Sequence, residues 1–452
     1  MKHPIPFIEQ TGTHVLMITN HGVHQWQVIP GLPDTGGQSI YVNQLTEALV
    51  GQGYRVTIVN RGGYPHPVTG EPQVGVVEHP SGRARIMYLD DGRAEFVHKE
   101  DMDEQIPALA ADLATRLAAD GSQFDLIMSH YWDAGKLGAI VNERSHRRVP
   151  HIWTPHSLGS LKKRNMDPST WEELRIDERI AHERALLTEI DGAVATSTAI
   201  REAFADDYGY RSRYFLPPCI DTDRYHPRPA DACTGIWDFL AERSHFSAAE
   251  LRHRLLVTEI SRTDRTKRKD VLIRAFAEAR KEIPESLLVV ALDARAGEPY
   301  AAAMDLIEEV GLEQDVIVLG SVWDELPCLY AVTSVYCTPS VMEGFGMSAQ
   351  EAAATGKPVV TSDLVPFAVE YLLGDEPEWV GLDGHRFQMG EGAIIVPADS
   401  VDGFSRALIT LLGDEDIRTA MGDKALTITV PYFTWEQRTR DLLDDLAIRP
   451  GP

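Results

Sequence analysis

The chain has 452 residues, more than one hydrophobic core usually supports, so two domains with separate cores are expected. Its 43 Lys and Arg stand against 68 Asp and Glu, and the formal net charge of -25 argues against nucleic acid or an anionic membrane as partner, although a local basic pocket for a small anion stays possible. The four cysteines lie far apart without a CxxC pair, so the sequence predicts neither a zinc site nor a disulfide framework, and it fits a reducing cytoplasm.

Short runs rich in Val, Ile and Leu alternate with longer helical patterns along the whole chain, and no apolar run is long enough to span a membrane. This alternation predicts parallel sheets covered by helices on both faces, an α/β fold with two doubly wound sheets. In the first half the expected strands are Val15–Thr19, Arg55–Asn60, Phe124–Ser129, His151–Pro155 and Gly192–Ser197. In the second half they are Leu255–Ser261, Leu287–Leu292, Val316–Leu319, Ser334–Thr338, Pro358–Ser362 and Ala393–Val396.

A glycine-rich turn, Gly31-Leu32-Pro33-Asp34-Thr35-Gly36-Gly37-Gln38, precedes the first helical pattern. Because Gly36 and Gly37 have no Cβ, a phosphate or sugar oxygen can approach their backbone amides closely. The competing interpretation is that the glycines serve only the geometry of the turn. The segment is not the GxGxxG fingerprint, which disfavours a nicotinamide site.

A basic loop, His156 to Arg164, follows the strand expected at residues 151–155 and holds Ser157, Lys162, Lys163 and Arg164. In so acidic a chain, this local reversal of charge favours a phosphorylated small molecule as the ligand. A solvated basic loop remains the alternative. In the following helical segment, Arg179 and Glu183 are one turn apart, so they can also pair with each other.

Consecutive prolines at Pro217-Pro218 predict a stiff connector, and we place the hinge between the two domains there. Ligands of such sheets bind beyond the carboxyl ends of strands, which predicts one cleft between the domains. A second basic loop, Ser261 to Lys269, lies between a strand and a helix, where Arg262 and Lys267 are placed to balance the charge of a departing diphosphate.

The segment Glu343 to Glu351 is the strongest single pattern, because two carboxylates flank a glycine-rich turn at the start of an expected helix. The free amides of that turn, at Phe345, Gly346 and Met347, suit phosphate oxygens. Glu343 is then expected to accept hydrogen bonds from sugar hydroxyls, and Glu351 is expected to accept them from the two ribose hydroxyls of a nucleotide. The alternative is an ordinary strand, turn and amphipathic helix with solvated glutamates.

Taken in order, these segments resemble the retaining glycosyltransferases of GT-B fold in family GT4, in particular the sucrose-phosphate synthase and sucrose synthase branch. The resemblance covers nearly the whole chain. The matching segments are Gly31–Gln38, His130-Tyr131-Trp132-Asp133-Ala134-Gly135, His156-Ser157-Leu158-Gly159 with Lys162, Arg179-Ile180 with Glu183, Pro217-Pro218-Cys219-Ile220-Asp221, Arg262 with Lys267, Glu343 with Glu351, and Phe433-Thr434-Trp435-Glu436.

The resemblance implies an acceptor-binding Rossmann-like domain at residues 1–218, a nucleotide-sugar-binding one at 219–430, and a final helix at 431–452 that crosses back to the first domain. The implied reaction moves a hexosyl group from a UDP- or GDP-hexose to a small acceptor, most simply a sugar phosphate, with retention, in the cytoplasm and without a cofactor or strictly required metal. The implied catalytic residues are His156, Arg262, Lys267 and Glu343. Donor binding also involves Gly36, Gly37, Phe345, Gly346, Met347 and Glu351, and acceptor binding involves Gln38, Tyr131, Asp133, Ser157, Lys162 and Arg179.

Two departures from the family pattern leave the acceptor and donor sugar open. Asp363-Leu364-Val365-Pro366 stands where sucrose-forming relatives carry Asn-Gly-Gly-Pro, and Glu178 stands where some carry a second basic residue. A phosphoglycerate, or a neutral polyol or sugar, is therefore an alternative acceptor.

The alternative classes of protein are a nucleotide-sugar epimerase, a pyridoxal-phosphate phosphorylase and a binding module without catalytic activity. Asp221-Thr222-Asp223 imitates a metal-binding DxD, but at a hinge it is better explained as a turn.

Overall fold

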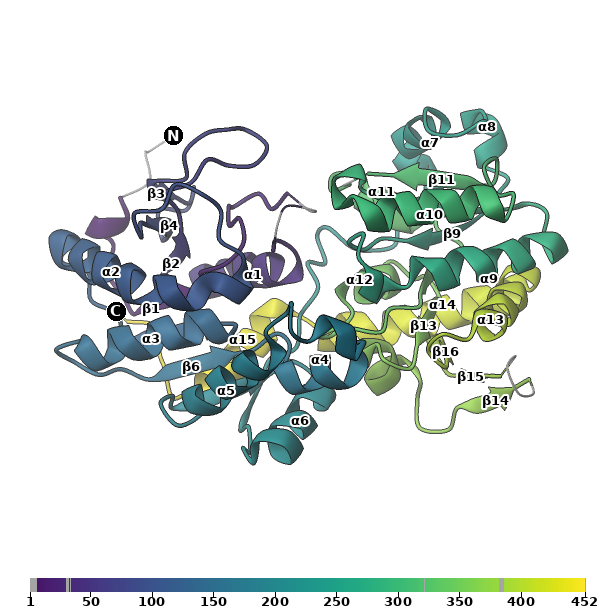
Figure 1. The fold of residues 1–452 in the computed structure, drawn as a ribbon. Coiled ribbons are helices and arrows are strands. Elements are labelled where there is room, and N and C mark those ends of the chain that lie inside the picture. The colour runs from purple at the N-terminus through teal and green to yellow at the C-terminus, as the bar shows by residue number, and fades with distance from the viewer. Residues whose placement is uncertain (1–5, 30–31, 33, 321, 382–385, 452) are drawn as a thin grey trace. The chain divides into compact units, whose positions relative to one another are not determined.

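The computed structural model describes residues 6–29, 32, 34–320, 322–381 and 386–451 (Figure 1). It divides into two compact units, unit 1 (Met1–Cys219 with Trp435–Pro452) and unit 2 (Ile220–Thr434). The division after Cys219 comes one residue later than the boundary expected from the prolines. The last segment of unit 1 starts at Trp435, whereas the sequence suggested residue 431.

The described residues of unit 1 form an eight-stranded sheet in the order β3-β4-β2-β1-β5-β6-β7-β8. Its strands pair in parallel, except that the edge strand β3 is antiparallel to β4. The bounds are β1 (His14–Ile18), β2 (Arg55–Arg61), β3 (Gly75–Glu78), β4 (Ala84–Leu89), β5 (Leu126–His130), β6 (His151–Thr154), β7 (Gly192–Ala195) and β8 (Tyr214–Phe215). The five strands expected from the sequence are confirmed as β1, β2, β5, β6 and β7. The strands β3, β4 and β8 were not predicted.

Helices flank this sheet, and the C-terminal one lies against the first (Figure 1). The nitrogen Nε1 of Trp435 donates to Oε1 of Gln44 at 3.0 Å, and the Trp435 ring packs edge-on against Tyr41. The α-helices are α1 (Gly37–Gly51), α2 (Ile106–Asp120), α3 (Trp132–Arg144), α4 (Gly159–Asn165), α5 (Ile176–Leu186), α6 (Thr198–Tyr208) and α15 (Trp435–Asp445), with short 3-10 turns η1 (Phe7–Glu9), η2 (Lys99–Gln105) and η3 (Pro168–Thr170).

The described residues of unit 2 form a second eight-stranded sheet in the order β11-β10-β9-β12-β13-β16-β15-β14. It is parallel from β11 to β16, and two antiparallel strands complete it. The bounds are β9 (Leu255–Glu259), β10 (Ser286–Ala291), β11 (Val316–Leu319), β12 (Val335–Thr338), β13 (Val359–Ser362), β14 (Glu378–Val380), β15 (Phe387–Met389) and β16 (Ala393–Val396). All six expected strands are confirmed, whereas β14 and β15 were not predicted.

The helices of unit 2 follow its parallel strands in turn, as expected for a doubly wound sheet. They are α7 (Thr234–Ala241), α8 (Ala248–Leu251), α9 (Lys269–Glu282), α10 (Glu298–Glu309), α11 (Leu326–Val332), α12 (Met347–Ala354), α13 (Val401–Gly413) and α14 (Glu415–Tyr432), with the short turns η4 (Ala230–Cys233), η5 (Arg265–Lys267), η6 (Ala294–Ala296) and the π-helical η7 (Ala368–Leu372).

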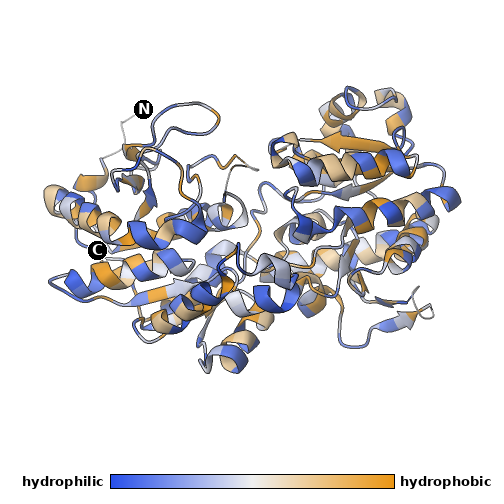
Figure 2. Ribbon diagram, viewed as in Figure 1, coloured by the Kyte–Doolittle hydropathy of each residue, from blue (hydrophilic) through white to orange (hydrophobic). Residues whose placement is uncertain are grey.

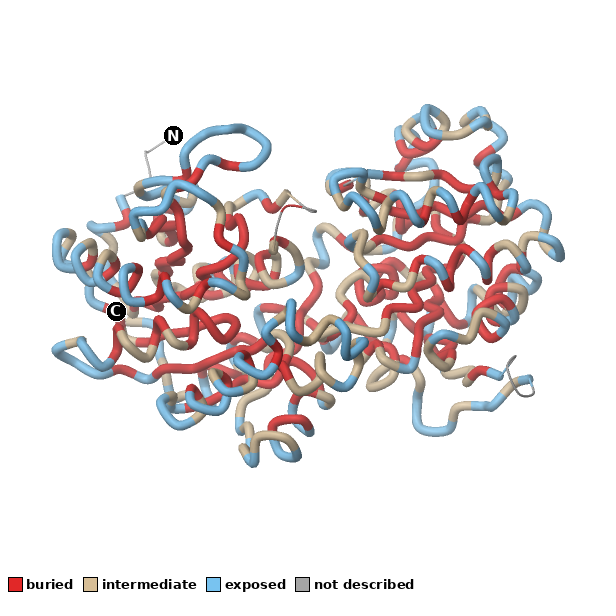
Figure 3. Tube along the Cα trace, in the orientation of Figure 1, coloured by how far each residue is buried: buried red, intermediate tan, exposed pale blue. Residues whose placement is uncertain are grey.

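The central strands of both units are apolar and buried, which explains why the sequence revealed them. Every residue of β1 and β5 in unit 1, and of β10 and β13 in unit 2, is buried. Figure 2 shows orange apolar residues on strands and on helix faces of both units, and Figure 3 shows the buried inner segments of each unit in red. Burial on both faces is what helices on both sides of a parallel sheet produce. The carboxyl ends of the strands are thereby left as the places where polar side chains can collect.

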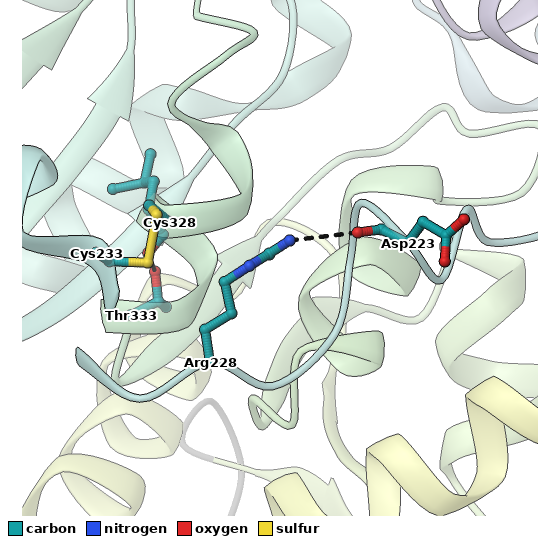
Figure 4. Close-up of a disulfide and its surroundings, with 6 residues drawn as sticks. Asp223, Arg228, Cys233, Cys328 and Thr333 are labelled. Atoms are coloured by element: carbon teal, nitrogen blue, oxygen red, sulfur yellow. Dashed lines mark hydrogen bonds between the residues drawn. A yellow bond between two sulfur atoms is a disulfide. The ribbon is translucent and has the colours of Figure 1, made fainter. Parts of the chain in front are cut away.

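The structure corrects one expectation, because Cys233 and Cys328 form a disulfide within unit 2 (Figure 4). Their Cα atoms are 5.3 Å apart although 95 positions separate them along the chain. Cys233 ends the turn η4 and Cys328 lies in α11, so the bond ties the segment after the hinge to that helix. The prediction of no disulfide was wrong because the pairing depends on tertiary contacts that spacing alone does not carry. Cys219 and Cys337 are free and buried.

Candidate functional site

In unit 2, the basic loop after β9 meets the Glu343 segment after β12. The ammonium Nζ of Lys267 lies 2.5 Å from Oε1 of Glu343 and also approaches the carbonyl oxygen of Met342. Lys267 is 6% exposed, so its charge is largely shielded from water. Their strands, β9 and β12, are neighbours in the parallel sheet, which places both loops at the same edge. Two residues predicted for the donor site are thus brought together by the fold.

Arg262 lies in the same loop but is solvent-exposed, with its Nη2 3.3 Å from Oδ2 of Asp264. An exposed ion pair of this kind contributes little to stability, so the guanidinium can leave Asp264 at small cost. Lys269, by contrast, is buried in an ion pair with Glu259 and bonds the carbonyl oxygen of Ala291 at 2.7 Å. Of these three cations, Arg262 is movable, Lys267 is paired with Glu343, and Lys269 is structural.

The glycine turn before α12 is shaped by Gly346, which has a φ of 109° and is the residue before the first helical turn. A Cβ there would lie 2.6 Å from Cγ1 of Val365, so both conformation and space demand glycine. Phe345 is buried against Phe367 and Phe433, which fixes the turn from behind. The amides of Gly346 and Met347 lie at the N-terminus of α12, where anions are favoured.

Glu351 lies on α12, one turn after Met347, and is only 8% exposed. Its Oε2 accepts a hydrogen bond from the Tyr330 hydroxyl at 3.2 Å. Burial raises the pKa of Glu351 to about 7, although Tyr330, Arg224 and Tyr225 act in the opposite direction. Glu351 is therefore a buried carboxyl near its titration midpoint at neutral pH, which is unlike the solvated glutamate of the alternative interpretation.

In unit 1, the glycine turn leads straight into α1, which starts at Gly37 with Gly36 as its N-cap. Gly31 and Pro33 of the predicted motif lie outside the described residues. The Gln38 side chain donates to Oγ1 of Thr19 at the end of β1, at 2.9 Å. Asp34 accepts a backbone hydrogen bond from Lys99 at 3.1 Å and pairs with its ammonium. The turn is therefore attached to the end of β1 through Gln38 and to η2 through Asp34.

A pair of histidines occupies the carboxyl ends of β5 and β6. Nδ1 of His130 lies 2.9 Å from Nε2 of His156, and the ring of Tyr41 packs edge-on against both. Burial lowers the pKa of His156 to about 3 and also holds the pKa of His130 well below its usual value. His156 also has a φ of 57°, a conformation that residues with a Cβ rarely adopt. A neutral imidazole held in this way suits hydrogen bonding to a hydroxyl.

Tyr131 and Asp133 lie at the start of α3, directly after His130 in the chain. Asp133 is fully buried, and its Oδ1 lies 3.0 Å from Nδ1 of His21. Its effect on any ligand therefore passes through His21, which the sequence analysis did not select. Tyr131 has a φ of 79°, and its carbonyl oxygen accepts a hydrogen bond from Trp153 Nε1 at 2.9 Å.

Arg179 is the centre of a buried network in unit 1. Its Nε donates to Oε1 of Glu183 at 2.8 Å, its Nη1 to the Tyr131 hydroxyl, and its Nη2 to the carbonyl oxygen and hydroxyl of Ser157. Burial opposes the charge, but Tyr131 and Glu183 outweigh it, so the pKa of Arg179 is raised. The pairing with Glu183 that the spacing left open is confirmed. Most of the guanidinium is thus occupied by protein partners.

Lys162 and Arg179 line a pocket within unit 1 that also contains cations not selected from the sequence. Lys99 from η2 and Arg175 before α5 contribute the additional positive charges, and Glu100, Asp103 and Glu178 contribute carboxylates. Arg175 has a φ of 44° and pairs with Asp101 at 3.2 Å. Lys99 and Arg175 could have been noticed only as lone cations in acidic surroundings, because they are far from Lys162 in sequence.

Both departures from the family pattern occupy informative positions. Val365 fills the space beside Gly346, and Glu178 lines the cationic pocket next to Arg179. At the hinge, Oδ1 of Asp221 accepts hydrogen bonds from the backbone N–H groups of Asp223 and Arg224, both at 3.1 Å, which is the pattern of a turn.

Over the part of the chain that the structure describes, no group of three or more His, Cys, Asp or Glu is arranged to hold a metal ion. No helix in that same part is both long and apolar enough to cross a membrane.

Comparison with known proteins agrees with this geometry. Residues 35–224 match the description Glycosyltransferase Family 4, and residues 242–427 match Glycosyl transferases group 1. The D-inositol 3-phosphate glycosyltransferase of Kineococcus radiotolerans is 30% identical over 88% of this chain and 87% of its own length. The mannosylfructose-phosphate synthase of Agrobacterium fabrum is 29% identical over 77% of this chain and 76% of its own. Among solved structures, the sucrose-phosphate synthase of Thermosynechococcus elongatus has a TM-score of 0.78 at 24% identity, covering 96% of this chain and 98% of that one.

The chain therefore belongs to glycosyltransferase family 4 and has the GT-B fold. The expected family and fold class are both confirmed.

Proposed function

We propose that this glycosyltransferase moves a hexosyl group from a nucleotide sugar to a small phosphorylated acceptor, with retention of the anomeric configuration. The observation that carries the proposal is the meeting of Lys267 and Glu343, 2.5 Å apart, beside the N-terminus of α12. A cation and free helix amides suit a diphosphate, and a neighbouring carboxylate suits sugar hydroxyls.

In the proposed donor site, Lys267 and Arg262 balance the charge on the departing nucleoside diphosphate, so that no metal ion is required for this role. Glu343 is held by Lys267 and accepts hydrogen bonds from hydroxyls of the hexose. The amides of Phe345, Gly346 and Met347 hold phosphate oxygens of the donor. In unit 1, the amides of Gly36 and Gly37 at the start of α1 are likewise proposed to bind phosphate oxygens. Glu351, a buried carboxyl whose Oε2 is bonded by Tyr330, accepts hydrogen bonds from the ribose hydroxyls.

In the proposed acceptor site, the cationic pocket of unit 1 receives the phosphate. Lys162, Lys99 and Arg175 supply charge, whereas Arg179 is more deeply engaged and holds Ser157 and Tyr131 in place. His21, the partner of Asp133, packs against Tyr131 of this pocket, and Gln38 is proposed to bind the acceptor as well. The names of both reported relatives contain a phosphorylated sugar or polyol, which supports an acceptor of this kind. Because Glu178 lines the pocket, its carboxylate offsets part of the positive charge there. The proposed acceptor phosphate is therefore bound by fewer cations than in a pocket with a second basic residue at this position.

The proposed chemistry needs no protein nucleophile. The bond between the anomeric carbon and the phosphate oxygen breaks, and the acceptor hydroxyl oxygen bonds to that carbon from the same face. The hydroxyl proton passes to the departing phosphate oxygen, so the products are the glycoside and the nucleoside diphosphate. His156, neutral because of burial, orients a hydroxyl of the hexose during this step.

A thermal-shift titration with UDP, GDP, ADP and their hexose derivatives tests the donor half, because a ligand that binds the folded state raises its melting temperature. The best donor is then incubated with fructose 6-phosphate, D-inositol 3-phosphate, 3-phosphoglycerate and an unphosphorylated polyol. Release of nucleoside diphosphate only with phosphorylated acceptors, with an α-linked product from an α-linked donor, is expected. Isomerised donor without any acceptor would indicate an epimerase instead.

A further inference from the structure

Glu351 is enclosed by aromatic hydroxyl groups of unit 2. Tyr330 donates to its Oε2 at 3.2 Å and is itself fully buried. The Tyr330 ring packs against Tyr225 and Tyr336, each with ring centroids 6.0 Å away. Because the Tyr330 ring is packed between two other rings, its hydroxyl has a fixed position. That position determines where Oε2 of Glu351 lies.

The helix that carries Tyr330 is short and is anchored from outside. Helix α11 contains seven residues, and a helix of that length has little stability of its own. Cys328, two positions before Tyr330, is covalently bound to Cys233 of η4 (Figure 4). Immediately before α11, the guanidinium of Arg224 stacks over Trp323 at 4.2 Å and donates to its carbonyl oxygen. The segment after the hinge thus holds α11 by one covalent link and one polar link.

We propose that Tyr330 is a positioning residue, which fixes the Glu351 carboxylate for a nucleoside diphosphate, and that the Cys233–Cys328 disulfide anchors the helix presenting it. The inference rests on the proposed donor site and adds to it a residue outside the Glu343 to Glu351 segment. Tyr330 acts through Glu351 and does not itself contact the ligand.

The test uses the full chain and the diphosphate among UDP, GDP and ADP that stabilises it most. Calorimetry on Tyr330→Phe, which keeps the ring but removes the hydroxyl, is expected to show affinity weakened roughly tenfold or more, as for a hydrogen bond to a charged group. The matched control is Tyr336→Phe, which removes a hydroxyl of the same cluster that is directed at the carbonyl oxygen of Ile260. It is expected to leave affinity within about twofold, in line with a weak neutral hydrogen bond.

Two readouts separate positioning from a general loss of structure. With the 2′,3′-dideoxy form of the diphosphate, Tyr330→Phe and the unchanged protein are expected to bind equally, because Glu351 then has no ribose hydroxyl to accept. The pH midpoint of binding is expected to move upward in Tyr330→Phe, since Tyr330 favours the ionised form of Glu351. Equal loss for the normal and dideoxy ligands, or an unchanged pH midpoint, would overturn the inference. If none of the three diphosphates binds, the proposed donor site fails, and the inference fails with it.

The anchor is tested by dithiothreitol, a dithiol that converts the disulfide to two thiols while becoming a cyclic disulfide, and by Cys328→Ser. Both are expected to weaken diphosphate binding by about the same factor, smaller than that of Tyr330→Phe, and reduction should not affect Cys328→Ser further. Cys219→Ser, which changes a buried thiol of unit 1, serves as the control. Peptide mass spectrometry showing Cys233 and Cys328 unlinked in the purified protein, or unchanged binding on reduction, would overturn the role of the disulfide.

Discussion

The two candidate sites of this glycosyltransferase differ in how far their charges are already paired. In unit 1, Arg179 has three protein partners and Asp133 is fully buried against His21. In unit 2, Arg262 is exposed in a weak pair with Asp264, whereas Lys267 is buried and paired with Glu343. The comparison indicates that the Arg179 network of unit 1 is a rigid polar core, whereas Arg262 in unit 2 is an exposed cation that a ligand can engage at small cost.

The largest effect is expected from breaking the rigid core of unit 1. Arg179→Leu leaves Glu183 buried without its partner, and the loss of one member of a buried pair typically costs about 3 to 5 kcal/mol. Urea denaturation should show this loss in the unfolding free energy. The control is Arg274→Leu, since Arg274 forms an exposed pair with Glu309, and it should change stability by less than about 1 kcal/mol. Equal effects of the two changes would contradict the rigid-core description.

A smaller effect, confined to the acceptor, is expected from Lys162→Ala. Because a charge-assisted hydrogen bond contributes about 1.5 to 3 kcal/mol, the acceptor KM should rise roughly ten- to hundredfold. The donor KM should stay within about twofold, since Lys162 is not among the residues proposed to bind the donor. Steady-state kinetics with both substrates varied provides the measurement. A similar rise in both KM values would remove Lys162 from the acceptor site.

The donor side can be probed by pH, because burial places the pKa of Glu351 at about 7. Only the ionised carboxylate accepts two hydroxyls, so below that pKa binding must first remove a proton. Diphosphate affinity is therefore expected to rise about tenfold between pH 6 and pH 8 and then level off. In Glu351→Gln, affinity should be lower and flat over this range. A pH dependence that survives in Glu351→Gln would assign the titration to another group.

The smallest effect should come from Arg164→Ala, at the end of the basic loop that contains Lys162. Arg164 pairs at the surface with Asp207, at 2.8 Å, so its removal should change stability by about 0.2 to 1 kcal/mol. The acceptor KM should not change. A strong acceptor effect would show that the whole loop, rather than Lys162, recognises the phosphate.

The sequence was sufficient for strands marked by a run of apolar residues, such as β1 and β10, and also for β2, which buries Arg61 at its end. It was insufficient for strands whose apolar run is interrupted by a charge or is short. Strands β1 and β10 were visible as apolar runs, whereas β4 contains Arg85, whose charge interrupts the pattern although it is buried and pairs with Asp120 at 2.7 Å. The antiparallel β14 and β15 are short and partly exposed, so neither run length nor alternation marked them.

The site shows the same division. Glu343 to Glu351 could be recognised because turn, helix start and both carboxylates are consecutive in the chain. Lys99, His21 and Tyr330 could not, because each acts on a residue far away in sequence. The Cys233–Cys328 disulfide escaped for that reason as well. Local chemistry can be inferred from spacing, but the partners that tune it depend on which strands the fold makes neighbours.

The most direct test of the central claim is turnover by Arg262→Ala/Lys267→Ala, measured as nucleoside diphosphate release with the best donor and acceptor. If these cations stabilise the departing diphosphate, kcat should fall by at least about a hundredfold to a thousandfold at a temperature where the variant is still folded. Its melting temperature is measured alongside, because removal of Lys267 leaves Glu343 without its partner. Turnover at the parental rate in this double variant would contradict the account.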